Sequence, residues 1–107
     1  MKSDVAIALQ YLQGRDVDRD PVQAVKLYTQ AALQGDAAAQ AALGQFYERG
    51  IGVSKDIVTA FAWYRLSADQ HDDDGTAGTV RLRSLLSHDQ WNAAQILHDQ
   101  FAAAVRQ

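Results

Sequence analysis

Several residue types are scarce in this chain, and each scarcity excludes a class of function. The 107 residues include no cysteine, which excludes disulfides, thiolate zinc sites and cysteine nucleophiles. Basic residues are outnumbered, since 10 Lys and Arg stand against 13 Asp and Glu and give a formal net charge of −3. That balance argues against a nucleic-acid-binding protein, because such proteins neutralise phosphates with an excess of Lys and Arg.

Long hydrophobic runs are also absent. The longest stretch without a formally charged residue covers only residues 37–47 and contains two glutamines, so it is too short to span a bilayer. The start of the chain, residues 1–4, has no apolar segment of the kind found in signal peptides. We therefore expect no membrane association and a cytoplasmic location. A periplasmic or secreted location stays open if the sequence lacks its natural start.

Glutamate is nearly missing, and aspartate takes its place. Twelve of the 13 acidic residues are Asp, and Glu48 is the only Glu. Asp is a mediocre residue inside a helix but a strong N-cap, because its carboxylate accepts hydrogen bonds from the free N–H groups of the first turn. In a chain of 48% hydrophobic and 21% charged residues, this pattern predicts one globular domain of several short, capped helices.

An internal repeat organises the chain. Shifting the sequence by 36 residues aligns residues 5–36 with residues 41–72 without a gap, and 11 of the 32 pairs are identical. A helical repeat of this length predicts a solenoid of helix pairs, in which each pair buries its apolar face against its neighbours. The tyrosines recur at the repeat period, which favours core positions for Tyr11, Tyr28, Tyr47 and Tyr64.

Capping residues predict where the helices begin. Ser87 and Gln90 form a capping box, and Pro21 suits the first position of a helix because its missing N–H has no partner there. We expect six helices, the first over residues 3–13, three starting at Asp20, Asp36 and Asp56, and two over residues 76–86 and 89–106. They would form a single domain of residues 1–107, with repeats at 3–35 and 36–71 and a divergent cap at 72–107.

The second repeat carries a recognisable signature. It reads Ala39-x3-Leu43-Gly44-x2-Tyr47-x2-Gly50-x-Gly52-Val53-x2-Asp56-x3-Ala60-x2-Trp63-Tyr64-x3-Ala68 and resembles the Sel-one-like repeat (SLR), a relative of the tetratricopeptide repeat with a longer turn between its helices. The first repeat departs from the signature at Ala8, Asp16 and Leu27. The resemblance implies an all-α fold, an α-α superhelix of antiparallel helix pairs, and a role as a scaffold.

No motif indicates catalysis or metal binding. The segment 71–75 is rich in Asp but lacks the alternating acids and distal Glu of a calcium loop, so it is interpreted as a solvated turn with Asp N-caps. His88 and His98 each precede an Asp but have no third ligand at metal spacing, and we expect them on the surface. The predictions are therefore no metal, no cofactor and no enzymatic activity.

The remaining candidate for function is the surface. In related two-helix repeats the first helices line a concave groove, and the resemblance places groove-facing residues on the first helix of each pair. Leu9 and Leu12 flank the expected Ile7–Tyr11 face, so they should be partly exposed and mark an interaction site. The candidate partner-binding residues are Leu9, Leu12, Gln13, Gln45, Glu48, Arg49, Arg81 and Ser84.

The sequence thus favours a non-catalytic adaptor that binds a protein or peptide in this groove. Two alternatives stay open. One is a hydrolase, because a few SLR proteins have been proposed to act on cell-wall or β-lactam substrates, although those relatives are rich in cysteine and this chain has none. The other is a structural segment that associates with itself through its N-terminal end.

Overall fold

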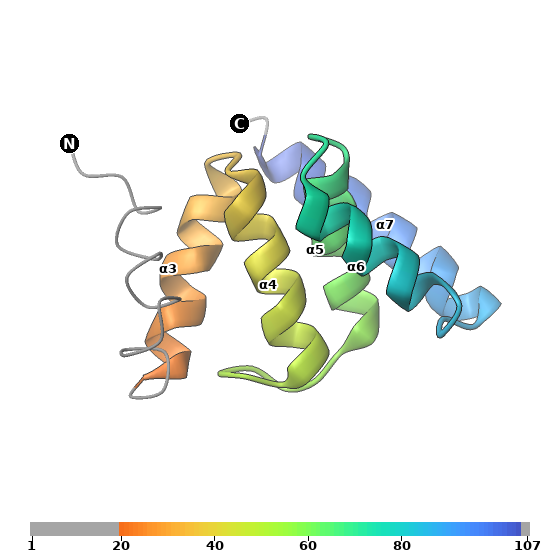
Figure 1. Ribbon diagram of the computed structural model, residues 1–107, viewed down its shortest axis with the longest axis horizontal. Coiled ribbons are helices and arrows are strands. Elements are labelled where there is room, and N and C mark those ends of the chain that lie inside the picture. The colour runs from red at the N-terminus through yellow and green to blue at the C-terminus, as the bar shows by residue number, and fades with distance from the viewer. Residues whose placement is uncertain (1–19, 106–107) are drawn as a thin grey trace.

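The computed structural model describes residues 20–105, and the helices in this range follow one another in an antiparallel stack (Figure 1). They are α3 (Pro21–Leu33), α4 (Ala37–Arg49), α5 (Ile57–Ala68), α6 (Asp73–Arg83) and α7 (His88–Val105). The predicted all-α class and superhelix of helix pairs are confirmed. The helix expected over residues 3–13 lies outside the described residues.

Helix α5 lies at the centre of the stack. It packs against α4 on one side and against both α6 and α7 on the other, and α3 packs on α4. Seen as in Figure 1, α6 lies in front and α7 behind. Residues of α4, α6 and α7 therefore all pack around α5.

Aspartate caps start four of the helices, as predicted for three of them. The fourth, Asp72, accepts a hydrogen bond from the Gly75 N–H at 3.0 Å and starts α6. Asp20, Asp36 and Asp56 each accept from an N–H two or three residues further on, at 2.7–3.2 Å. Before α7, the reciprocal bonds of the capping box between Ser87 and Gln90 are 2.9 and 3.1 Å long.

The range predicted for α6 was wrong by three residues at each end. We expected a helix over residues 76–86, and the helix covers Asp73–Arg83. It begins earlier because the Asp72 carboxylate caps it, and the exposed Asp73 and Asp74 then lie in the first turn, where negative charge favours a helix. It ends earlier because the Leu85 N–H bonds to the Leu82 carbonyl, which tightens the last turn.

The turn between α4 and α5 depends on two glycines. Gly50 and Gly52 have φ values of 72° and 73°, in the left-handed region that favours glycine. A Cβ on Gly52 would also come within 2.4 Å of the Pro21 carbonyl oxygen, so the turn packs against the start of α3. The signature glycines thus set both the turn and its contact with the preceding repeat.

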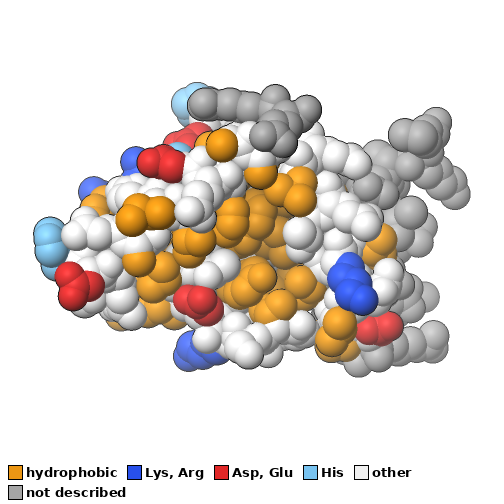
Figure 2. Space-filling view, turned by 180° about the vertical axis from the view of Figure 1, so that it is seen from behind, with side chains coloured by type: hydrophobic (Ala, Val, Ile, Leu, Met, Phe, Trp, Pro, Cys, Tyr) orange, Lys and Arg blue, Asp and Glu red, His pale blue; other side chains and the backbone are white. Residues whose placement is uncertain are grey.

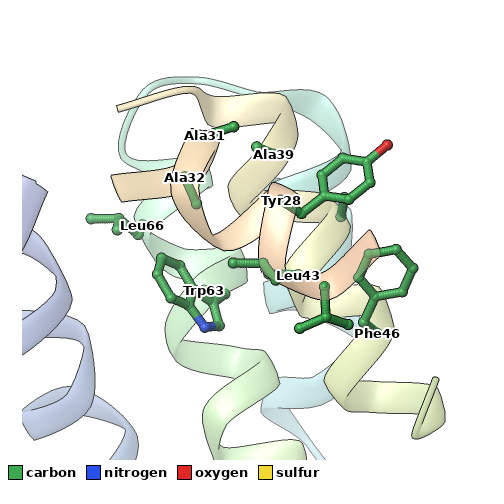
Figure 3. Packing of buried hydrophobic residues seen from close by; sticks show 10 residues of the cluster. Tyr28, Ala31, Ala32, Ala39, Leu43, Phe46, Trp63 and Leu66 are labelled. Atoms are coloured by element: carbon green, nitrogen blue, oxygen red, sulfur yellow. The ribbon is translucent and has the colours of Figure 1, made fainter. Parts of the chain in front are cut away.

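The core has two hydrophobic clusters. The first joins α3, α4 and α5, and Figure 3 shows Tyr28, Phe46 and Trp63 among its members. Helix α7 closes this cluster, because the Phe101 ring stacks on Trp63 with a centroid distance of 4.1 Å. The second cluster joins α4, α5, α6 and α7 through the buried residues Ala41, Ala60, Phe61, Tyr64, Leu82 and Ala94.

The tyrosines predicted as core residues differ in burial. Tyr28 and Tyr64 are only 2% and 1% exposed. Tyr47 is instead half-buried and contacts both clusters from their edge, so its placement in the core was only partly right. Tyr11 lies outside the described residues. From behind, hydrophobic side chains also gather over the middle of the molecule, with charged side chains around them (Figure 2).

Candidate functional site

The ring of Tyr64 lies between two glycines on neighbouring helices. A Cβ on Gly44 of α4 would come within 2.6 Å of the ring, and a Cβ on Gly78 of α6 would come within 2.4 Å. A Cβ does not approach a nonbonded atom this closely, so any side chain at either position would displace the ring. The two glycines thus let α4 and α6 approach α5 closely around one aromatic side chain.

The Tyr64 hydroxyl extends from this packed ring into a polar group. It donates a hydrogen bond to Glu48 Oε1 at 2.7 Å and accepts one from Arg81 Nη2 at 3.2 Å. Arg81 also binds the Glu48 carboxylate through two hydrogen bonds, 2.6 and 3.0 Å long. We call these three residues the Tyr64 cluster. It joins α4, α5 and α6 through side chains that are far apart in the sequence.

The electrostatics of the Tyr64 cluster hold each group in its ordinary protonation state. Hydrogen bonds from Arg81 lower the pKa of Glu48, against the opposing effect of its partial burial. Burial and the hydrogen bond to Glu48 raise the pKa of Tyr64 above its usual value. Near neutral pH, Glu48 is therefore ionised and Tyr64 protonated, and the charges of Glu48 and Arg81 balance each other.

A groove of about 490 Å³ lies beside the Tyr64 cluster, between α4 and the end of α6. We call it the α4–α6 groove. Its lining comprises Gln45, Glu48, Arg49, Lys55, Ile57, Arg81, Leu82 and Leu85. Four of the predicted partner-binding residues, Gln45, Glu48, Arg49 and Arg81, thus come together in one place.

Of the other predicted partner-binding residues, only Ser84 is described by the structure, and it does not line this groove. Ser84 is exposed and forms the C-cap of α6, outside the lining. Leu9, Leu12 and Gln13 lie outside the described residues.

Sequence reasoning missed Lys55, Ile57 and Leu85. Lys55 and Ile57 reach the groove because the chain folds back after the glycine turn, where the Asp56 N–H bonds to the Tyr47 carbonyl at 2.8 Å. Leu85 follows Arg81 by four residues, and in the helix predicted over residues 76–86 that spacing places both residues on the same side. That spacing was the one signal in the sequence that could have added Leu85.

The α4–α6 groove combines unpaired positive charge with exposed apolar surface. Arg49 and Lys55 are exposed and form no ion pair or hydrogen bond with another described residue. Leu85 is 61% exposed at the end of the groove. Since Glu48 is already bound to Arg81, the charge that the groove offers to a partner is positive.

One histidine prediction was wrong. The His98 side chain is only 13% exposed, because its two ring nitrogens lie 2.5 Å from an Asp69 oxygen and 3.1 Å from an Asp99 oxygen. His98 thus connects α7 to the end of α5. His88, at the start of α7, is exposed as predicted.

Residues 20–105 offer neither a metal site nor a membrane-spanning helix. No group of three or more His, Cys, Asp or Glu in this range could hold a metal ion. No helix in the described part of the chain has the length and apolar character needed to cross a membrane.

The comparison with protein families confirms the resemblance. The Sel1 repeat model matches residues 4–36 and residues 37–72. This chain belongs to the Sel1 repeat family. Two copies of the repeat therefore precede the last helix pair, in agreement with the 36-residue period in the sequence.

Solved structures of similar proteins share the fold. One is a protective antigen of uropathogenic Escherichia coli strains that displays an SLR fold, with a TM-score of 0.86 and 32% identity; the match covers 95% of this chain and 22% of that one. Another is a Sel1 repeat protein from Oxalobacter formigenes, with a TM-score of 0.67 and 37% identity over 74% of this chain and 32% of that one.

Curated relatives match only over short segments. A putative sel1-like repeat-containing protein of Acanthamoeba polyphaga mimivirus is 49% identical over 45 residues, which are 42% of this chain and 8% of that protein. Mouse protein sel-1 homolog 2 is 40% identical over 48 residues, or 45% of this chain and 7% of the relative. These matches therefore cover less than a tenth of each curated relative.

Proposed function

We propose that this chain is a non-catalytic interaction module that binds a protein or peptide along the α4–α6 groove. The observation that carries the proposal is one groove that combines exposed apolar surface, at Leu85, with two cations, Arg49 and Lys55, that have no ion-pair partner among the described residues. Family membership agrees with it, because Sel1 repeats typically mediate protein interactions.

The structure of the groove suits a partner segment that is both apolar and acidic. Leu85 and Ile57 offer apolar contact, which supplies affinity that salt hardly screens. Arg49 and Lys55 attract carboxylates and would mainly raise the association rate and the selectivity. Glu48 and Arg81 hold each other in place in the lining, so these two side chains lose little conformational entropy when a partner binds.

The lining of the groove favours binding over catalysis. The described residues that line it include no serine, threonine, histidine or cysteine that could act as a nucleophile or a base. Its one carboxylate, Glu48, is held ionised by Arg81 and so cannot donate a proton near neutral pH. These features support an interaction module rather than a hydrolase.

The test is quantitative capture from a lysate of the native host, followed by mass spectrometry. Leu85→Asp and Arg49→Glu probe the groove. Leu33→Asp is the matched control, because Leu33 is 41% exposed on α3 and does not line the groove. We expect at least one captured protein to be lost with Leu85→Asp, weakened with Arg49→Glu, and retained with Leu33→Asp.

One result of the capture experiment would contradict the proposal. If every captured protein binds all three variants equally, the α4–α6 groove is not the binding surface. Self-association through the N-terminal end would appear separately, as a dimer in sedimentation that Leu9→Asp or Leu12→Asp dissociates.

A further inference from the structure

A second hollow, of about 310 Å³, lies among α5, α6 and α7. We call it the Trp91 hollow, because the indole of Trp91 lines it and packs against Phe61 with a centroid distance of 5.2 Å. From α6 it is lined by Val80 and Arg83, which project from the side of the helix away from Arg81. Helix α6 therefore separates the two hollows.

Two arginines face the same indole in this hollow. The guanidinium carbons of Arg65 and Arg83 lie 5.9 and 5.4 Å from the centre of the Trp91 ring. Both distances are within the range of a cation–π contact. A guanidinium that rests on an aromatic ring still presents its N–H groups at its edge, where a carboxylate can accept two hydrogen bonds.

Neither arginine has a carboxylate partner among the described residues. Arg65 donates to the neutral amide oxygen of Gln95, and Arg83 forms no hydrogen bond or ion pair with another described residue. Asp69 also lines the hollow, but its carboxylate is bound by His98 Nε2 at 2.5 Å. Among the described residues, neither arginine of the Trp91 hollow is therefore paired with a carboxylate.

Arg81, which lies on α6 like Arg83, already has a carboxylate partner. Two residues before Arg83, it binds the Glu48 carboxylate through two hydrogen bonds and lies 5.6 Å from the centre of the Tyr64 ring. Arg83 has the matching aromatic contact but lacks the carboxylate. The chemical group that completes the arrangement is therefore a carboxylate from another molecule.

We propose that the Trp91 hollow is a second binding site, which takes a glutamate or aspartate side chain of a protein partner next to an apolar residue. The carboxylate binds Arg83 and Arg65, and the apolar side chain packs on Phe61, Trp91 and Val80, the last of which is 70% exposed. A phosphate-rich ligand fits less well, because Asp69 lies in the lining and the chain carries a net charge of −3.

The experiment uses the two tryptophans as local reporters. Trp63 is stacked on Phe101 away from the hollow, so its indole N–H signal in a ¹H–¹⁵N spectrum serves as an internal reference for that of Trp91. The probe is the capped peptide acetyl-Gly-Ser-Leu-Glu-Ser-Gly-amide. Its controls are the same peptide with Gln in place of Glu, and inorganic phosphate at equal ionic strength.

We expect the Glu peptide to shift the Trp91 signal saturably and to leave the Trp63 signal in place. The Gln peptide should bind about tenfold more weakly, as should the Arg83→Gln variant with the Glu peptide, since each change removes a charge-assisted pair. Lys26→Gln is the matched control, because Lys26 is exposed on α3 outside the hollow, and it should bind like the wild type.

Three results would overturn the proposal. One is equal binding of the Glu and Gln peptides. Another is undiminished binding by Arg83→Gln, whose fold is checked by circular dichroism. The third is a phosphate response at Trp91 as strong as that of the Glu peptide at the same concentration, which would make the hollow a general anion site.

Discussion

In the second repeat, the turn between α4 and α5 contains two left-handed glycines, whereas the turn between α6 and α7 contains no glycine at all. The first turn is shaped by Gly50 and Gly52. The second is closed by the capping box of Ser87 and Gln90. Even so, the first helices of the two pairs, α4 and α6, both pack closely on α5.

What the two pairs share is a glycine against the Tyr64 ring. Gly44 contacts the ring from α4 and Gly78 contacts it from α6, although the repeat signature includes only Gly44. The Asp caps are shared as well, since Asp36 and Asp72 start the first helices of the two pairs. The last helix pair therefore keeps the Asp cap and the close glycine contact with Tyr64, although its turn lacks the glycines of the repeat signature.

The largest expected effect comes from removing the Tyr64 ring, against which both α4 and α6 pack. Tyr64→Ala should lower the free energy of unfolding by about 3–5 kcal/mol, because it deletes a fully buried aromatic side chain. Tyr47→Ala, at the half-buried edge of the core, should cost clearly less. Urea unfolding followed by circular dichroism measures both, and equal losses would contradict the difference in burial.

The glycine contacts are the next to test. Gly44→Ala and Gly78→Ala each place a methyl group inside the contact distance of the Tyr64 ring, and overpacking of this kind costs about 1–3 kcal/mol. Ala77→Leu is the control on α6, because Ala77 is exposed. If Gly78→Ala were as stable as the control, α6 would not approach α5 as closely as α4 does.

The two turns should respond to different changes. Gly50→Ala places a side chain at a φ of 72° and should cost about 1–2 kcal/mol. Ser87→Ala removes one half of the capping box and should cost about 1 kcal/mol. Thermal unfolding of both variants checks this. A larger loss of stability for Ser87→Ala than for Gly50→Ala would show that the capping box stabilises the α6–α7 turn more than Gly50 stabilises the α4–α5 turn.

The smallest effect concerns the ion pair that joins the two helix pairs. Because the pKa of Glu48 is lowered from 4.5 in the folded state, the pair stabilises the fold above that pH, and the stabilisation is lost as the pH falls through the lowered pKa. Glu48→Gln should therefore be less stable than the wild type at pH 7, and the difference should shrink toward pH 3.

Urea unfolding at several pH values measures this difference. Arg81→Gln should show the same trend, because it removes the other partner of the pair. A difference between Glu48→Gln and the wild type that stays constant with pH would contradict the assignment.

Much of the fold could be predicted because its signals are local. An Asp cap bonds to an N–H two or three residues away, and the capping box of Ser87 and Gln90 spans three residues. The boundaries of α6 were missed for a related reason, since Asp72 is one of three consecutive Asp residues and only the structure shows which of them caps the helix.

The candidate site was predicted only in part. The repeat pattern placed Gln45, Glu48, Arg49 and Arg81 on the first helices of their pairs, and they do line one groove. The pattern did not show that Glu48 and Arg81 bind each other, or that Lys55 and Leu85 join them. Those relations depend on how α6 packs against α4, which no short segment of the sequence encodes.

By itself, the sequence determined the all-α class, the 36-residue repeat, the Asp-capped helix starts and the glycine turn, because each depends on hydrogen bonds and side-chain spacing within a few residues. Only the tertiary structure decided which charges are paired. Glu48 meets Arg81, Asp69 meets His98, and Arg83 meets an indole instead of a carboxylate, because packing on α5 brings together residues that are distant in the chain.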